Sequence, residues 1–168
     1  MSSGPSPPRP PSPPAVARSL HVPPYQLAAL SLFVIVTMLA LLGVFGQATA
    51  YADGRGATLA VRVEHPARFR YGQRGSLRAW ITNTSARRLD SVRVAFDTAY
   101  VNGFSSVRFT PPVDEAYAVV LTGLQPRETR LVHAEVEADR VGLRPGAVSV
   151  SAGGTDSVRV PVQTFVFP

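Results

Sequence analysis

The most prominent feature of the hydropathy pattern is an apolar run near the N-terminus. Leu27 to Phe45 spans 19 residues without a charged side chain. A helix over this run would be about 28 Å long at ~1.5 Å per residue, close to the ~30 Å hydrocarbon core of a bilayer. Together with its flanking residues, the run predicts one transmembrane α-helix over residues 25–50.

Three small or polar residues of this segment, Ser31, Thr37 and Gly43, are candidates for packing against other transmembrane helices. The two hydroxyl groups could instead bond to the backbone of their own helix, which is the simpler interpretation. A secretory signal peptide is the alternative for the whole run, because Ala48-Thr49-Ala50 fits a cleavage site. The anchor is favoured, since the apolar core of a signal is usually only ~7–15 residues long.

From residue 57 onward, hydrophobic and polar residues alternate with a period of two. Turns containing Gly, Pro or Asn separate eight segments with this pattern. The segments are Leu59–Glu64, Leu77–Thr82, Val92–Asp97, Val107–Phe109, Tyr117–Leu121, Val132–Glu137, Val148–Ser151 and Val158–Gln163. Short strands with one apolar face each predict two packed antiparallel sheets, an all-β immunoglobulin-like sandwich of about seven or eight strands over residues 57–168.

Two local predictions complete this layout. Residues 51–56 are expected to form a linker between the helix and the sandwich. Asn102-Gly103, placed between Val101 and Phe104, predicts a two-residue hairpin turn. Asn-Gly is favoured in that turn because both of its central residues need a positive φ.

The first 24 residues form a Pro-rich tail with nine of the 16 prolines of the chain. Proline fixes φ and lacks a backbone donor, so residues 1–24 are expected to be disordered or to sample polyproline II. The tail is either a docking strip laid across a partner's cytoplasmic face or a solvated segment without a role. The sequence alone favours the solvated segment.

The charge distribution predicts the orientation in the membrane. Arg9 and Arg18 precede the apolar run without an acidic residue beside them, whereas the charges just after the run cancel. The positive-inside rule therefore places the N-terminus in the cytoplasm and the sandwich in the periplasm or its equivalent. All 17 basic residues are arginines, a bias that suggests a high-GC bacterial genome, so the expected location is the bacterial inner membrane.

Two parts of the expected sandwich follow a recurring pattern. Ile81–Ser85 with Leu89–Val94 fits V-x-N-x-[GS] … L-x-x-V-x-V, and Leu124–Thr129 with Gly146–Ala152 fits L-x-P-G-E-x … G-x-Y-x-V-x-V. Residues 57–163 thereby resemble the CARDB-type immunoglobulin-like modules of bacterial envelope proteins. Arg127 stands where that pattern has a glycine, and Ala147 stands where it has an aromatic residue. The resemblance implies a sandwich with a binding or spacer role and without active-site residues.

No residue pattern predicts an enzyme, a metal site or a cofactor site. The chain has no cysteine, and His21, His65 and His133 are far apart in the sequence. A zinc site needs three or four convergent ligands, and a hydrolase triad needs a positioned nucleophile. The arginines are spread over separate strands, which does not predict a nucleic-acid-binding surface. We therefore expect no catalytic residue, no metal, no cofactor and no nucleic-acid partner.

Two weaker motifs have simpler interpretations. Asp114-Glu115 could bind calcium together with Asp97 or Asp156, but the EF-hand spacing is missing, so a solvated loop is favoured. Asn83-Thr84-Ser85 matches an N-glycosylation acceptor. Asparagine is expected at this position in any case, because the segment reads as a turn.

The outward-facing positions of the strands supply candidate interface residues. Four arginines at such positions, Arg62, Arg78, Arg93 and Arg108, accompany the single tryptophan, Trp80. Because an exposed Trp beside an Arg is typical of binding hot spots, the face around Trp80 is hypothesised to contact a protein or anionic lipid headgroups.

The C-terminal segment, which contains Phe165 and Phe167, is apolar on both faces of a strand. A terminus of this kind would be a sticky edge if it were left in water. It is therefore either the last strand that closes the core or an insertion into a partner.

Two functions remain open. The first is a non-catalytic, single-pass accessory subunit that stabilises or assembles a large bacterial membrane complex. The expected partners are the bilayer and other membrane subunits, contacted by helix, tail and sandwich together. A respiratory or photosynthetic complex is expected only because such complexes are the largest of their kind. The alternative is an envelope-anchored module that recognises an extracytoplasmic protein or ligand.

Overall fold

A computed structural model describes residues 23–43, 46–114, 116–153 and 156–168 of the protein. The chain divides into two compact units, residues 1–42 and residues 43–168. The predictions for the Pro-rich tail, for His21 and for Glu115 fall outside the described residues.

In the described part of the first unit lies the helix α1 (Pro24–Leu41). A proline in the first turn suits a helix start, because the proline nitrogen has no N–H to leave unpaired. Gly43 follows the end of the helix with a φ of 72°, a conformation that glycine adopts without strain. The 18 residues of α1 are apolar enough, and the helix is long enough, to cross a membrane.

The helix differs from its prediction at one end. It ends at Leu41, well before the predicted bound at residue 50, so Gly43 terminates the helix and does not lie within it. Thr37 Oγ1 donates to the carbonyl of Phe33 at 2.8 Å, the bond to its own backbone that the sequence favours.

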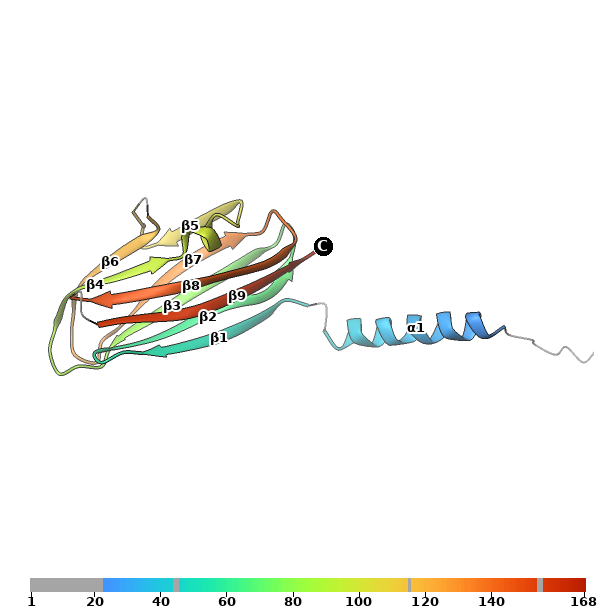
Figure 1. The fold of residues 1–168 in the computed structure, drawn as a ribbon, viewed down its shortest axis with the longest axis horizontal. Helices are drawn as coiled ribbons and strands as arrows, with labels where there is room; N and C mark the ends of the chain where they lie inside the picture. The colour runs from blue at the N-terminus through green and yellow to red at the C-terminus, as the bar shows by residue number, and fades with distance from the viewer. Residues whose placement is uncertain (1–22, 44–45, 115, 154–155) are drawn as a thin grey trace, which may run out of the picture. The chain divides into compact units, whose positions relative to one another are not determined.

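The second unit is a curled β-domain (Figure 1). Its elements, in chain order, are β1 (Ala48–Arg55), β2 (Leu59–Arg70), β3 (Arg74–Asn83), β4 (Leu89–Phe96), α2 (Thr98–Val101), β5 (Ser106–Thr110), β6 (Ala118–Leu124), β7 (Thr129–Glu137), β8 (Gly142–Ala152) and β9 (Asp156–Phe167). The eight segments that the sequence predicts correspond to β2 through β9. The prediction of an all-β, sandwich-like domain is confirmed.

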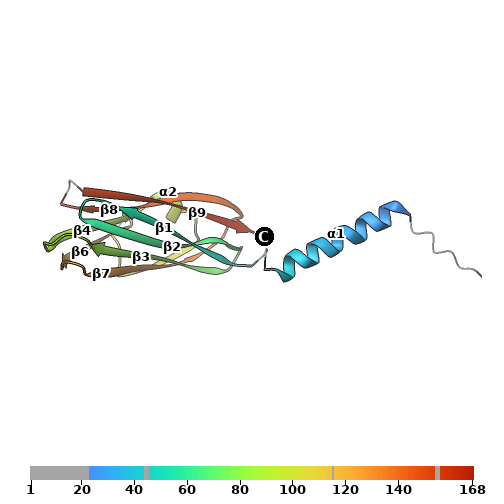
Figure 2. The same ribbon diagram turned by 90° about the horizontal axis from the view of Figure 1, so that it is seen from below.

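The strands form one continuous sheet in the order β5-β7-β3-β2-β9-β8-β4-β6, and β1 pairs with β2. The sheet folds over into two layers around one core, with β1, β2, β3, β5 and β7 in one layer and β4, β6, β8 and β9 in the other. In Figure 2, β8 and β9 lie along one side of the domain and β3 and β7 along the other. The layers are joined where Arg68–Arg70 of β2 run parallel to Phe165–Phe167 of β9. All other pairings are antiparallel. Two separate sheets were expected, and this short parallel pairing connects them.

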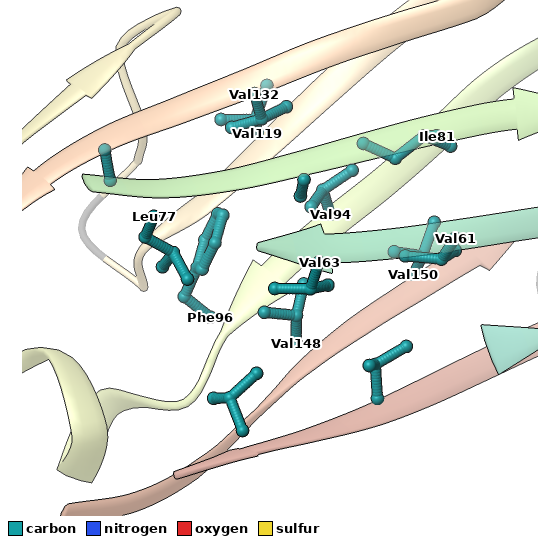
Figure 3. Close-up of a cluster of buried hydrophobic side chains, with 14 of the residues drawn as sticks. Val61, Val63, Leu77, Ile81, Val94, Phe96, Val119, Val132, Val148 and Val150 are labelled. Carbon is teal, nitrogen blue, oxygen red and sulfur yellow. The ribbon is translucent and has the colours of Figure 1, made fainter. Parts of the chain in front are cut away.

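The core lies between the two layers. Alternate residues of each strand point inward, so Val61, Val63, Leu77, Ile81 and Val132 of one layer meet side chains of the other, which include Val94, Phe96, Val119, Val148 and Val150 (Figure 3). The period-two alternation of the sequence predicts these positions because successive strand side chains point to opposite faces.

Strand β1 is the element that the sequence does not predict. It begins at Ala48, so it takes up the end of the predicted helix segment and nearly all of the predicted 51–56 linker. Its inward positions hold alanine and glycine, which give no hydrophobic alternation. A Cβ at Gly54 would lie 2.6 Å from Val158 Cγ1, so only glycine lets β1 pass this close to β9. The one available signal is the alternation of small residues with Thr49, Tyr51, Asp53 and Arg55.

The predicted hairpin at Asn102-Gly103 is wrong. Asn102 caps the C-terminal end of the short helix α2 with a φ of −67°, which no type I′ turn allows. Asp97 begins the same helix by accepting hydrogen bonds from the backbone N–H groups of Ala99 and Tyr100. Because Asp97 caps this helix, residues 98–101 adopt helical backbone conformations, and Asn102-Gly103 follows a helix and does not connect two strands.

Arg127 occupies the glycine position of the CARDB-type pattern with a φ of 61°. The left-handed conformation destabilises a residue with a Cβ by about 1–2 kcal/mol. Glycine avoids this strain, but it loses more backbone entropy on folding, and this loss cancels part of the gain. We expect Arg127→Gly to raise the free energy of unfolding by about 0.5–1 kcal/mol, measured by thermal unfolding of the full chain in detergent. Arg127→Ala is the control, because it removes the same side chain and keeps the Cβ. Equal stabilities of the glycine and alanine variants would contradict the strain argument.

Candidate interaction face

The outer surface of β1, β2, β3 and β7 forms a regular grid around Trp80, here called the Trp80 face. Strand register places its outward side chains in three neighbouring rows. The rows are Asp53–Arg62–Trp80–Leu131, Tyr51–Glu64–Arg78–His133 and Arg55–Ala60–Thr82–Thr129. The predicted neighbours Arg62, Arg78 and Trp80 are therefore brought together on one face.

Two of the three arginines in these rows, Arg62 and Arg78, are paired with acids on adjacent strands. Arg62 Nε donates to Asp53 Oδ1 at 2.7 Å, and an Arg78 terminal nitrogen lies 3.5 Å from Glu64 Oε1. The hydrogen bond from Arg62 lowers the pKa of the Asp53 carboxyl, so Asp53 stays ionised. Ion pairs as exposed as Arg62–Asp53 contribute little to stability. Their effect here is to neutralise the positive charge that the sequence suggests for this surface.

The sequence suggests an exposed Trp80. In the structure, the Trp80 side chain is half-buried. Its row flanks it with Arg62 on one side and Leu131 on the other. It stands between two hollows of the surface, one of about 640 Å³ towards β1 and one of about 550 Å³ towards β5. Ala60 contributes only a methyl group to the first hollow, between Arg55 and Thr82 in the same row.

The second hollow is lined by apolar and polar side chains in roughly equal number. Leu131, 45 % exposed, and Pro111 border it beside Trp80. His133 lies at its margin and shares a hydrogen bond of 3.0 Å with Ser76 Oγ, which fixes the imidazole ring. A large aromatic ring between two surface hollows offers the rigid, partly desolvated anchor that protein interfaces use.

The structure separates the remaining candidate residues from one another. Arg108 of β5 faces outward opposite Glu135 of β7, at the far edge of the layer that carries the Trp80 face. Arg93 lies on β4, in the other layer, and contacts Asp114 at 3.3 Å. Phe165 is exposed near the end of β9, and Phe167 is half-buried under the Arg70 guanidinium. Strand β9 closes the core with alternate side chains, which fits the first of the two roles expected for the C-terminus.

Asp97, Asp114 and Asp156, the described carboxylates considered for calcium, accept hydrogen bonds from backbone N–H groups, and each lies in a different part of the domain. Asp97 caps α2, and Asp114 Oδ1 accepts hydrogen bonds from the N–H groups of Ala116 and Ala118. Asp156 accepts three bonds from Ala57 and Thr58, which tie the β1–β2 turn to β9. The bonds from Thr58 lower the pKa of the Asp156 carboxyl. Within the described ranges, no three His, Cys, Asp or Glu side chains gather in a way that could hold a metal ion.

Asn83 also has a structural role, and the sequence motif around it is not a glycosylation site. Its side chain is fully buried, with Nδ2 donating to the carbonyls of Arg87 and Leu124. Its Oδ1 accepts from the N–H and the hydroxyl of Ser85. A buried amide with four hydrogen bonds cannot be presented to a modifying enzyme.

Comparison with known proteins found no matching family model and no matching curated protein. Among solved structures, a CARDB domain from Pyrococcus furiosus, described as being in complex with di-metal ions, is 11% identical with a TM-score of 0.45. That match covers 69% of this chain and 94% of the CARDB domain. A GAE domain from Saccharomyces cerevisiae is 13% identical with a TM-score of 0.39, over 72% of this chain and 98% of that domain.

A β-glucosidase from Listeria innocua is 16% identical with a TM-score of 0.33, over 74% of this chain and 17% of the enzyme. At these TM-scores the likenesses carry no argument about the present chain. The sandwich-like fold is assigned from its own strand pairing and buried core.

Proposed function

We propose that the chain is a non-catalytic, single-pass membrane subunit whose β-domain binds other subunits of a bacterial membrane complex through the Trp80 face. The observation that carries the proposal is the position of Trp80, half-buried between two hollows of a sheet surface. Tryptophan is the residue type most enriched at interface hot spots, and surrounding contacts that exclude water raise its contribution.

Charge pairing on the Trp80 face favours a protein over a lipid headgroup as the partner. Arg62 and Arg78 have carboxylate partners on neighbouring strands, so of the three arginines in these rows only Arg55 is left to attract a phosphate. A protein surface can instead fill the two hollows with side chains and extend the existing rows of ion pairs.

The helix and the charge bias support the rest of the proposal. Helix α1 is long and apolar enough to span a membrane. Arg9 and Arg18 before it favour a cytoplasmic N-terminus and a periplasmic β-domain by the positive-inside rule. Weak contacts by helix, tail and domain on one chain would add up through their high effective concentration. An energy-converting complex, respiratory or photosynthetic, stays an expectation about the identity of the assembly.

The second candidate function is an anchored module that recognises an extracytoplasmic ligand by strand addition. Strands β5 and β6 are the two ends of the described sheet, so each presents an edge that could pair with an extended peptide. Native electrophoresis of membranes solubilised in mild detergent separates the two functions. Stoichiometric co-migration with a large complex supports the first, and migration as a lone 17.9 kDa chain supports the second.

Trp80→Ala tests the Trp80 face directly. Loss of a hot-spot side chain costs about 2 kcal/mol or more, equivalent to about a 30-fold weaker Kd. We expect the variant to lose its partners during purification in detergent while its thermal unfolding stays close to that of the wild type. Val120→Ala is the matched control, because Val120 is 53 % exposed on β6 of the other layer. Unchanged recovery of the complex with Trp80→Ala would refute the proposed binding face.

A further inference from the structure

Exposed apolar side chains gather at one end of the β-domain. Among the described residues from 46 onward, seven large hydrophobic side chains are exposed: Tyr51, Tyr71, Val120, Leu131, Val141, Leu143 and Phe165. Four of these, Tyr71, Val141, Leu143 and Phe165, lie where β2 and β9 end and β8 begins. These four residues, together with Phe167, are here called the end patch. The remaining three are scattered over other strands.

Strand pairing brings Leu143, Phe165, Phe167 and Tyr71 of the end patch close together. Leu143 of β8 pairs with Phe165 of β9, and both side chains point outward with exposed fractions of 57 % and 46 %. Phe167 pairs with Arg70, and the N–H of Tyr71 donates to the carbonyl of Phe167 at 2.8 Å. The C-terminus of the chain and the first residue of β1 lie at this same end of the domain (Figure 1).

Arginines are frequent around the end patch: Arg68, Arg70, Arg74, Arg140 and Arg144 belong to the strand ends and loops of this region. Arg144 points to the opposite side of β8 from Leu143, where its guanidinium carbon lies 5.9 Å from the Phe104 ring centroid. Arg74 is paired with Glu137 at 3.2 Å, and Asp139 is the other acid nearby in the loop. The Arg70 guanidinium carbon lies 5.6 Å from the centroid of the Phe167 ring. Basic residues in surplus over acids, next to exposed aromatic rings, are suited to a surface with both apolar and anionic groups.

The connection to α1 limits how far this end can lie from the helix. Ala48, the first residue of β1, pairs with Arg68, which also pairs with Phe165. Seven residue steps separate Leu41 from Ala48, so at most ~3.6 Å per step they span about 25 Å.

We propose that the end patch rests on the bilayer that α1 spans, with Phe165 and Leu143 at headgroup depth and the exposed Arg70 and Arg140 paired to anionic phospholipids. The inference rests on the membrane anchor of the proposed function. Aromatic and arginine side chains are enriched at this level of a membrane, where one part of the side chain is apolar and the other is wet. A tethered surface needs only weak affinity to stay bound, because the tether keeps its effective concentration high.

The single tryptophan of the chain makes a direct test possible. In a Trp80→Phe background, an indole is introduced by Phe165→Trp or, as the matched control, by Val120→Trp in β6. Each full chain is reconstituted into nanodiscs of phosphatidylcholine and phosphatidylglycerol, with or without brominated acyl chains. We expect bromine to quench the fluorescence of the Phe165→Trp protein strongly and to leave that of the Val120→Trp protein unchanged. Adding Leu143→Ser, or raising the salt concentration, should weaken the quenching.

The outcomes separate the docking from the anchor. Equal or absent quenching at both positions, in a chain that resists alkaline carbonate extraction, overturns the docking and leaves the anchor intact. Release of the wild-type chain by carbonate overturns the anchor itself. If Leu143→Ser removes a co-purifying protein and does not change the quenching, the end patch binds a protein, and the lipid assignment is wrong. Thermal unfolding of each variant confirms that these exposed positions tolerate the substitutions.

Discussion

Asn83→Ala is expected to lower the free energy of unfolding by about 3 kcal/mol, a large part of the 5–15 kcal/mol that holds a domain of this size together. The Asn83 side chain is fully buried and makes four hydrogen bonds. It links the β3–β4 turn to the end of β6, while its backbone pairs with Glu128 and Arg127 of the β6–β7 turn. Each lost bond costs about 1 kcal/mol, and the groups left behind are buried without a partner.

Thermal unfolding of the full chain in detergent, followed by Trp80 fluorescence, measures this loss. Thr84→Ala is the control, because its side chain is exposed one residue away in the same turn. Ser85→Ala should have an intermediate effect, since it removes the hydroxyl bonds to Asn83 Oδ1 and the Arg87 carbonyl and the bond accepted from the Arg87 N–H, but leaves the Asn83 amide in place. A loss below about 1 kcal/mol for Asn83→Ala would show that water replaces these bonds at little cost.

Tyr100→Ala is expected to cost about 4 kcal/mol, the range found when large aromatic side chains are removed from a core. Tyr100 is 2 % exposed and packs edge-on against Phe104 with ring centroids 5.1 Å apart. Its hydroxyl shares a hydrogen bond of 2.9 Å with Thr164, whose Oγ1 donates to the Pro66 carbonyl at 2.7 Å. The side chain thus connects α2 to β9 and β2, next to the join between the two layers.

Tyr100→Phe separates the hydroxyl from the ring. Burial raises the pKa of Tyr100 to about 12. The unfolded chain therefore ionises this group at a lower pH than the folded chain does. The wild type should lose stability as the pH rises from about 10 towards 12, and Tyr100→Phe should lose less over the same range. Identical pH profiles for the two proteins would mean that Tyr100 is not buried.

Gly146 supplies an independent check on the same contact. A Cβ at this position would overlap Tyr100 Cβ and lie 2.6 Å from Cγ, and these atoms cannot move without displacing α2. Gly146→Ala should therefore destabilise the domain by about 1–3 kcal/mol through overpacking. The CARDB-type pattern in the sequence contains this glycine, and the structure shows that its place is under an aromatic ring contributed by α2.

The eight strands β2 to β9 could be predicted because each carries its own alternation of apolar and polar residues, as in Leu59–Val63 and Val158–Val162. The apolar run of α1 was recognisable for a similar reason, since length and composition alone make it able to span a membrane. Such signals are local, because the spacing of apolar residues within one segment already indicates which of its side chains will be buried.

Strand β1, the Asn102 turn and the function of Asn83 were not readable in this way. Gly54 is needed only because β9 lies close beside β1, and the sequence does not indicate this contact. Asn102 follows a helical turn that is capped by Asp97, so its Asn-Gly pair is not a hairpin turn. Asn83 looks like a turn residue or a glycosylation acceptor until the β6–β7 turn folds back onto it.

The sequence by itself determined that this is an all-β domain following one apolar helix, with Trp80 and several arginines at outward positions of the strands. Only the tertiary structure decided that Arg62 and Arg78 are neutralised by Asp53 and Glu64, that Arg93 faces the other way, and that Phe165 meets Leu143 at the end nearest the helix connection. Periodicity fixes which face of a strand a residue occupies. Which residues share that face depends on strand order and register, and these are set by contacts between segments far apart in the chain.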